Sequence, residues 1–146
     1  MGRIVVAVTI EVTPEVLWES VRDIGSHVRW MADAETIRFT SERHEGIATT
    51  FDCETKIGPI RLTDRMEVTE WVDQRVIGVR HVGIVTGTGQ FVLTPAGPGA
   101  TRFRWEEDLL FPWWLGGRLG SVAGGVVLRL VWKRNLTNLK KLVEQN

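Results

Sequence analysis

The stretch that decides the fold runs from residue 87 to residue 109 and reads GTGQFVLTPAGPGATRFRWEEDL. On both sides of the turn-forming residues 96–99, apolar side chains alternate with polar ones, which is the period of a half-buried β-strand. We therefore predict a β-hairpin with one apolar face. The residues on that face are Phe91 and Leu93 before the turn, and Phe103, Trp105 and Leu109 after it.

The same alternation extends toward the N-terminus of the chain. Turn signals punctuate it near residues 44–46, at Gly58-Pro59, near residues 72–74 and near residues 83–85. The chain between Trp30 and the end of the hairpin therefore reads as a six-strand antiparallel meander. One further strand, with aliphatic residues at every second position from Ile4 to Val12, precedes it.

Helical signals lie on either side of the meander. Thr13 is a favourable N-cap and Pro14 suits the first helical position, so a short helix is expected after the first strand, ending at Gly25. A second helical turn is expected over residues 26–30. Residues 119–143 carry apolar side chains at helical spacing, and a helix of that length would extend roughly 40 Å.

A twisted seven-stranded sheet with one apolar face must curl and be covered, and the last helix is the only long element available to cover it. We therefore predict an α+β fold: a curved antiparallel sheet, two short helices after the first strand, and the C-terminal helix packed across the concave face. Residues 1–146 are expected to form a single domain with an apolar pocket between sheet and helix.

Composition argues against several classes of partner. The 146 residues include 18 basic and 18 acidic ones, so the charge pattern that nucleic acid attracts is not present, and no nucleic-acid partner is expected. Cys53 is the only cysteine, so no internal disulfide is expected, and no Cys/His spacing typical of a zinc site occurs. We therefore predict a cytoplasmic protein without a metal or other cofactor. Pro112, Arg118 and Arg129 interrupt the most apolar stretch, so stable membrane insertion is not expected. A monomer and a homodimer both remain open.

Five segments carry a family resemblance: residues 13–18, 23–30, 87–95, 99–107 and 138–144. On these residues the chain resembles the helix-grip (SRPBCC) superfamily, which includes START lipid-transfer domains and the birch pollen allergen, and within it the polyketide cyclase/dehydrase-like branch. The resemblance implies a fold that holds hydrophobic small molecules. Similar proteins include carriers, cyclases and quinone-binding chaperones, so it does not specify one reaction.

Three polar residues break the apolar pattern on the inward face: Asp64, His81 and Glu107. Turn positions predict Asp64 opposite residue 82, His81 opposite Gly89, and Gly89 opposite Glu107. The same arithmetic places Cys53 opposite Asp64. We therefore expect one polar row across the concave face, with a gap at Gly89.

This row has three possible roles. A histidine flanked by carboxylates under an apolar roof can act as an acid or base, as cyclisation or dehydration of a polyketide requires, so His81, Asp64 and Glu107 are the candidate catalytic residues. The same groups can instead hydrogen-bond a ligand. They can also simply satisfy one another in the core.

Most of the candidate ligand-binding residues, Trp105 among them, are expected to face the pocket, and the family resemblance implies that Trp30, Trp113 and Trp114 lie near its mouth. The candidates are Trp30, Phe39, Thr49, Phe51, Cys53, Met66, Val79, Gly89, Phe91, Trp105, Trp113, Trp114, Val122 and Val126.

Three functions follow as hypotheses. The first is a non-catalytic binder of a hydrophobic metabolite such as a lipid, polyketide or isoprenoid. The second is a cofactor-independent cyclase or dehydratase that uses the polar row. The third is an interaction module, as in the branch of the family that resembles ribosome-associated toxins, and the neutral charge balance gives it little support.

Overall fold

The computed structural model describes residues 2–115 and 117–145, and side chains within residues 3–114 and 124–145. The order of strands and helices is the one that the sequence predicts, with six consecutive strands between the short helices and the long C-terminal helix. The elements are β1 (Gly2–Ile10), α1 (Pro14–Val21), the 3-10 helix η1 (Ile24–Arg29), β2 (Ala34–Phe39), β3 (Thr50–Ile57), β4 (Ile60–Val72), β5 (Val76–Val82), β6 (Thr86–Pro95), β7 (Thr101–Leu110), the 3-10 helix η2 (Trp113–Leu115) and α2 (Gly117–Glu144).

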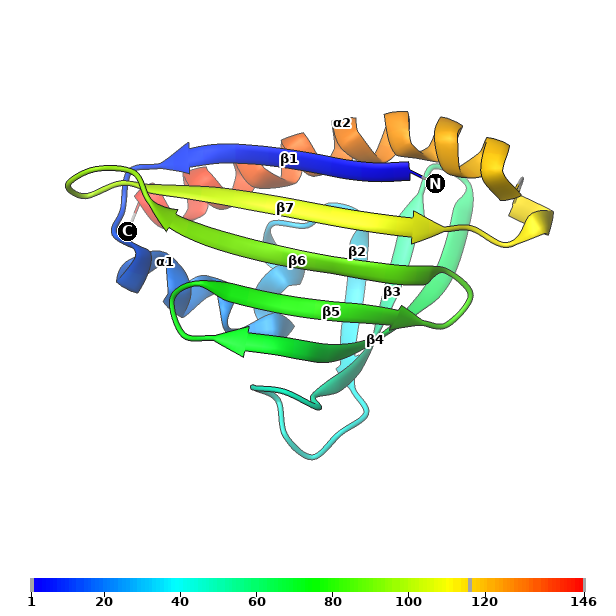
Figure 1. Cartoon of the computed structure of the whole chain (residues 1–146), viewed down its shortest axis with the longest axis horizontal. Coiled ribbons are helices and arrows are strands. Elements are labelled where there is room, and N and C mark those ends of the chain that lie inside the picture. The colour runs from blue at the N-terminus through cyan, green and yellow to red at the C-terminus, as the bar shows by residue number, and fades with distance from the viewer. Residues whose placement is uncertain (1, 116, 146) are drawn as a thin grey trace.

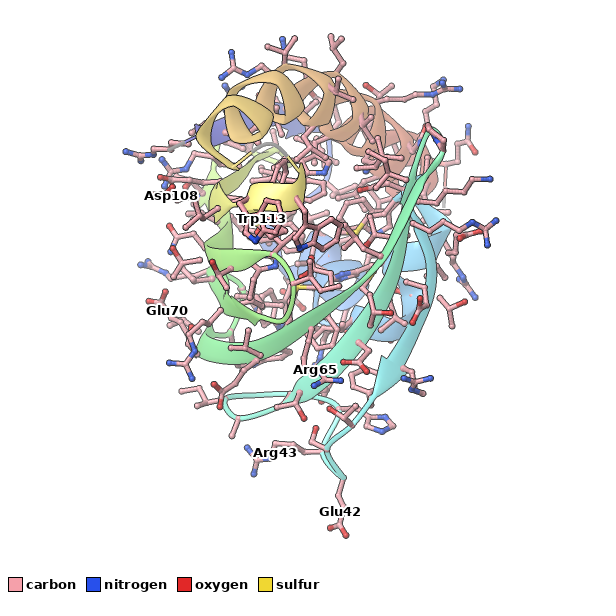
Figure 2. The ribbon with its side chains drawn as sticks, turned by 90° about the vertical axis from the view of Figure 1, so that its right-hand side faces the viewer. Glu42, Arg43, Arg65, Glu70, Asp108 and Trp113 are labelled. Atoms are coloured by element: carbon pink, nitrogen blue, oxygen red, sulfur yellow. The ribbon has the colours of Figure 1, made fainter. Side chains whose placement is uncertain are left out.

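The seven strands form one antiparallel sheet in the order β1-β7-β6-β5-β4-β3-β2. Helix α2 runs along β1, η1 packs against β2, and α1 contacts β6 and η1 (Figure 1). Seen from one end, the sheet curves beneath α2 (Figure 2). The predicted α+β fold, with a curved seven-stranded sheet and a long C-terminal helix, is confirmed.

The connection after β1 follows the local capping rules. The Thr13 hydroxyl accepts a hydrogen bond from the Val16 N–H at 3.3 Å, and Pro14 opens α1. The prediction that Gly25 ends this helix is wrong. Helix α1 ends at Val21 because Asp23 leaves the helical conformation, with φ −84° and ψ 82°, and Gly25 lies within η1.

The buried face of α2 differs in part from the predicted one. Val126 is 63% exposed and therefore points away from the sheet, contrary to the prediction that it lines a pocket. Apolar residues occupy both faces of the helix around residues 126–131, so helical periodicity alone does not select the inner face. The residues that α2 buries in the described part are Leu128, Trp132, Asn135, Leu136, Leu139 and Val143.

Candidate functional site

A cavity of about 140 Å³ lies between the concave face of the sheet, η1 and α2. Its wall is largely apolar. The predicted lining residues that border it are Phe51, Cys53, Met66, Val79, Gly89, Phe91 and Trp105, together with Asp64, His81 and Glu107.

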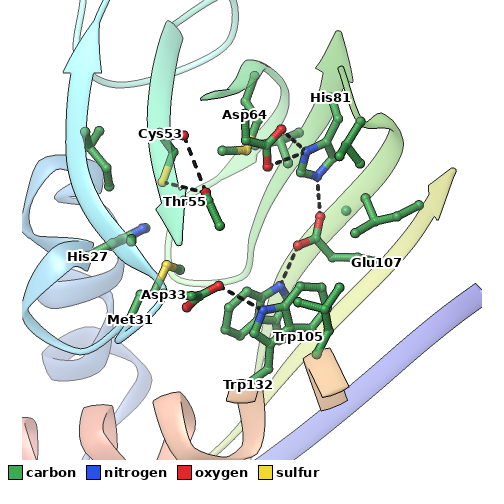
Figure 3. Close-up of a pocket in the computed structure, with 18 of the residues that line it drawn as sticks. His27, Met31, Asp33, Cys53, Thr55, Asp64, His81, Trp105, Glu107 and Trp132 are labelled. Atoms are coloured by element: carbon green, nitrogen blue, oxygen red, sulfur yellow. Dashed lines mark hydrogen bonds and ion pairs between the residues drawn. The ribbon is translucent and has the colours of Figure 1, made fainter. Parts of the chain in front are cut away.

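Four polar side chains of the wall form one continuous hydrogen-bonded network (Figure 3). His81 Nδ1 lies 2.8 Å from Asp64 Oδ1 and 3.0 Å from Oδ2. His81 Nε2 contacts Glu107 Oε1, and the Trp105 indole N–H donates to Glu107 Oε2 at 3.0 Å. We call Asp64, His81, Glu107 and Trp105 the polar network.

Two glycines in β6, Gly87 and Gly89, allow this network to form. His81 on β5 and Glu107 on β7 belong to strands on either side of β6, so about 10 Å of sheet separates their backbones. Gly87 pairs with His81, and Gly89 pairs with Glu107. A Cβ at residue 89 would lie 2.7 Å from Cδ of Glu107, so only glycine leaves room for the carboxylate to reach the imidazole.

The strand register agrees with prediction at two pairs and differs at two. Cys53 lies opposite Asp64, and Gly89 opposite Glu107, as predicted. His81 lies opposite Gly87 instead of Gly89, because the β5–β6 turn centres one residue earlier than expected. Across β4 and β5, His81 pairs with Met66, which places Asp64 diagonally beside it instead of opposite residue 82.

The electrostatics of the network favour a protonated imidazole. The His81 side chain is 2% exposed. Burial alone disfavours its charged form and is the largest single influence, but the charge of Glu107 and hydrogen bonds to Asp64 and Glu107 outweigh it and raise the pKa of His81 to about 10. At neutral pH the network therefore holds an imidazolium between two carboxylates.

Two other titratable groups on the wall are neutral. His27 is buried and its Nε2–H donates to the Val21 carbonyl at 2.7 Å, and burial lowers its pKa to about 4. Burial also raises the pKa of the Cys53 thiol to about 12. Neither group is a charged partner for a ligand, and Cys53 is a poor nucleophile in this state.

A second polar group on the wall was not predicted from the sequence. The Asp33 carboxylate accepts hydrogen bonds from Asn135 Nδ2 at 2.7 Å and from Trp132 Nε1 at 3.4 Å. Trp132 also stacks on Trp105, with ring centroids 4.4 Å apart. Asn135 breaks the apolar inner face of α2, just as Asp64 breaks that of β4, and the same rule applied to the helix would have indicated it.

Several predicted lining residues lie elsewhere, and these assignments are corrected. Trp30 is 1% exposed in the core and packs edge-on against Phe103 and Trp105, outside the cavity wall. Phe39 stacks on His44. The remaining corrections are Thr49, which is fully buried but does not border the cavity; Trp113 and Trp114, which are 85% and 56% exposed after β7; and Val126 on the outer face of α2. The side chain of Val122 lies outside the described residues.

Two features are absent from the described part of the chain. No group of three or more His, Cys, Asp and Glu side chains there is arranged to hold a metal ion. None of the helices in that part is long and apolar enough to cross a membrane.

Comparisons with known proteins bear on the family and on the fold. Residues 1–144 match the family model described as polyketide cyclase / dehydrase and lipid transport. A Thermus thermophilus protein of known structure is 18% identical, with a TM-score of 0.80 and coverage of 98% of this chain and 97% of that one. A START superfamily protein from Mycobacterium smegmatis is 14% identical, with a TM-score of 0.77 and 99% of each chain covered.

A third similar structure is that of an aromatase/cyclase. The Zhui aromatase/cyclase from Streptomyces sp. R1128 is 16% identical, with a TM-score of 0.72 and coverage of 98% of this chain and 93% of that one. At these identities the likeness establishes the fold alone. A comparison with curated proteins gave no match.

Proposed function

Because the chain belongs to the polyketide cyclase / dehydrase and lipid transport family, we propose that it binds an apolar small molecule in the cavity between the sheet and α2. The earlier resemblance to the helix-grip superfamily and its polyketide cyclase/dehydrase-like branch is confirmed by that family match and by the START-like and aromatase/cyclase structures. The proposal takes residues 1–146 as one ligand-binding domain. The polar network, Asp64 with His81, Glu107 and Trp105, would contact the polar group of the ligand.

One observation carries this proposal: three ionisable side chains lie together on the wall of a largely apolar cavity, with His81 and Glu107 buried and Asp64 mostly buried. Removing charges from water costs several kcal/mol for each ion, and apolar residues of similar size often give equal or greater stability. A network of this kind beside a cavity is therefore better explained by a ligand than by stability.

A second candidate function rests on the position of His81 between the two carboxylates. A cyclase or dehydratase needs one group that removes a proton and another that delivers one. One of the two carboxylates, Asp64 or Glu107, could remove the substrate proton. The His81 imidazolium could pass its own proton to the other carboxylate, which delivers it to the leaving hydroxyl to form water, and the first carboxylate then returns its proton to His81. The chain would then transform its ligand without a cofactor.

Native mass spectrometry of protein purified from its own host tests the first proposal. A stoichiometric apolar ligand, recovered unchanged after incubation, supports binding without chemistry. A ligand converted by the wild-type protein but not by the His81→Gln variant supports the enzyme. If neither endogenous nor added apolar molecules bind, the proposal fails.

A further inference from the structure

The charges on the cavity wall are unbalanced. Three carboxylates border the cavity, those of Asp33, Asp64 and Glu107, and one imidazolium, that of His81, faces them. No lysine or arginine borders it within the part of the chain that the structure describes. An anionic ligand would therefore meet excess negative charge in a poorly hydrated site, where such repulsion is strong.

The strong hydrogen-bond donors of the wall are already engaged. Both N–H groups of His81 are directed at carboxylates, and the indole N–H of Trp105 donates to Glu107. The Trp132 indole donates to Asp33, and the His27 imidazole to the Val21 backbone carbonyl. These groups have no second strong N–H to offer a ligand, because an indole and a neutral imidazole each carry only one.

The weaker donors do not serve the cavity either. The Thr55 hydroxyl donates to the Cys53 carbonyl at 3.4 Å. The Gln90 amide donates one N–H to Glu70 at 3.4 Å, and because this side chain lies on the outer face of the sheet, its second N–H does not point into the cavity. What remains is the thiol of Cys53, which is a weak donor. The free hydrogen-bonding capacity of the wall is consequently almost all accepting.

The carboxylates supply that accepting capacity. Each carboxylate offers about four lone-pair sites. Glu107 uses one oxygen for His81 and the other for Trp105, which leaves further sites on both oxygens. Asp64 directs both oxygens at the same His81 nitrogen and is 17% exposed, so its outer lone pairs are also open.

Building on the proposed function, we infer that the cavity selects uncharged apolar molecules that carry a hydrogen-bond donor, alcohols and phenols above all, and rejects carboxylic acids. A hydroxyl group can donate to Glu107 or Asp64 without needing a donor in return. A carboxylate ligand finds neither a free donor nor a positive charge that is not already paired.

Two pairs of one-ring compounds test this inference, since a cavity of about 140 Å³ is close to the size of an engineered site that holds benzene. p-Cresol and p-xylene differ only by hydroxyl against methyl. 4-Methylbenzamide and 4-methylbenzoate have the same shape, but the first is a neutral donor and the second an anion. Affinity is measured by NMR titration at neutral pH, following the indole N–H signal of Trp105.

The expected result is that p-cresol binds about tenfold more tightly than p-xylene, because one hydrogen bond to a charged acceptor is gained. 4-Methylbenzamide is expected to bind at least about tenfold more tightly than 4-methylbenzoate, because the anion loses its hydration without a positive partner.

A charge-neutralising variant adds a second measurement. Glu107→Gln keeps the shape of the side chain but removes one negative charge and adds a donor, so it should reduce the preference for the benzamide about tenfold. Glu70→Gln is the matched control, because Glu70 points away from the sheet on its outer face (Figure 2) and should leave the preference unchanged.

The outcomes separate the inference from the proposal beneath it. If p-xylene binds but 4-methylbenzoate binds as well as the benzamide, the cavity is real and the selectivity inference is wrong. If none of the four compounds binds, the inference and the proposed function both fail. The comparison among ligands uses the wild-type protein, so it stands even if Glu107→Gln does not fold.

Discussion

Alkaline pH should destabilise this protein through His81. In the folded chain the charge of Glu107 and the hydrogen bonds to both carboxylates outweigh burial and hold the pKa of His81 at about 10, against an ordinary value of 6.5. A group whose pKa is raised by folding stabilises the folded state fully below its unfolded pKa. That contribution is lost as pH rises from 6.5 through about 10.

The size of the effect follows from proton linkage. Between these two pKa values the folded chain holds one proton more than the unfolded chain, so the free energy of unfolding should fall by about 1.4 kcal/mol for each pH unit. Over the whole interval the loss is of order 5 kcal/mol, which is comparable to the total stability of many small domains.

Urea unfolding at a series of pH values measures this loss, provided that a second group is controlled. The thiol pKa of Cys53 is raised from 9.0 to about 12, so unfolding also releases a proton above pH 9 and adds a further decline there. A Cys53→Ala background removes this contribution. In that background, His81→Gln should abolish most of the decline between pH 6.5 and 9.

Parallel stability profiles for Cys53→Ala and for the double variant with His81→Gln, from pH 6.5 to 9, would refute the reasoning. Such a result would mean that His81 is not protonated between its two carboxylates. NMR titration of the imidazole gives an independent check, because its proton should remain bound throughout this range.

Three further predictions concern single positions. Gly89→Ala should lower the free energy of unfolding by about 2 kcal/mol in urea, because a Cβ there would lie 2.8 Å from Glu107 Cγ; an unchanged midpoint would show that Glu107 moves freely. Asn135→Ala should cost about 2 kcal/mol in thermal unfolding, because its buried amide oxygen accepts the Ala32 N–H at 2.9 Å, and a cost near zero would contradict this. Cys53 should react with iodoacetamide at least about a hundredfold more slowly than a free thiol, since the thiolate is the nucleophile; reaction at the free rate would argue against the buried thiol.

Most of the fold could be predicted because apolar residues at every second position mark the buried face of a strand. In β7 the alternation is complete: Phe103, Trp105, Glu107 and Leu109 are buried, and the residues between them are not. The same alternation identified Asp64 and His81 as polar residues on an apolar face. The composition of the polar row therefore followed from the sequence.

The exact register and the helix-borne part of the site could not be predicted in this way. Counting outward from a turn assumes an unbroken ladder of paired residues. An error of one residue in the predicted centre of the β5–β6 turn shifts the predicted partner of His81 by two positions along β6. On α2, residues 126 and 127 are both exposed although both are valines, because apolar sequence there surrounds the helix. Only three-dimensional packing determines that the face of α2 with Trp132 is turned toward the cavity.

One irregularity of the sheet has a consequence for the polar network. Between Val68 and Glu70 the β4–β5 ladder shifts by one residue, so that Thr69 has no partner. Beyond this β-bulge, odd-numbered residues of β4 such as Trp71 pair with Ile77; before it, even-numbered Met66 pairs with His81.

If Thr69 were instead paired in an unbroken ladder, the later register would continue, Glu67 would take the place of Met66 opposite His81, and the even-numbered half of β4 would face away from His81. The bulge leaves Thr69 unpaired and so keeps Asp64 on the same side of the sheet as His81. A relative of this chain that lacked the residue equivalent to Thr69 would keep these pairings in an unbroken ladder, whereas one that kept the residue without the bulge would turn Asp64 away from His81. Length changes in β4 therefore have to be considered together with the bulge when this site is sought in other chains.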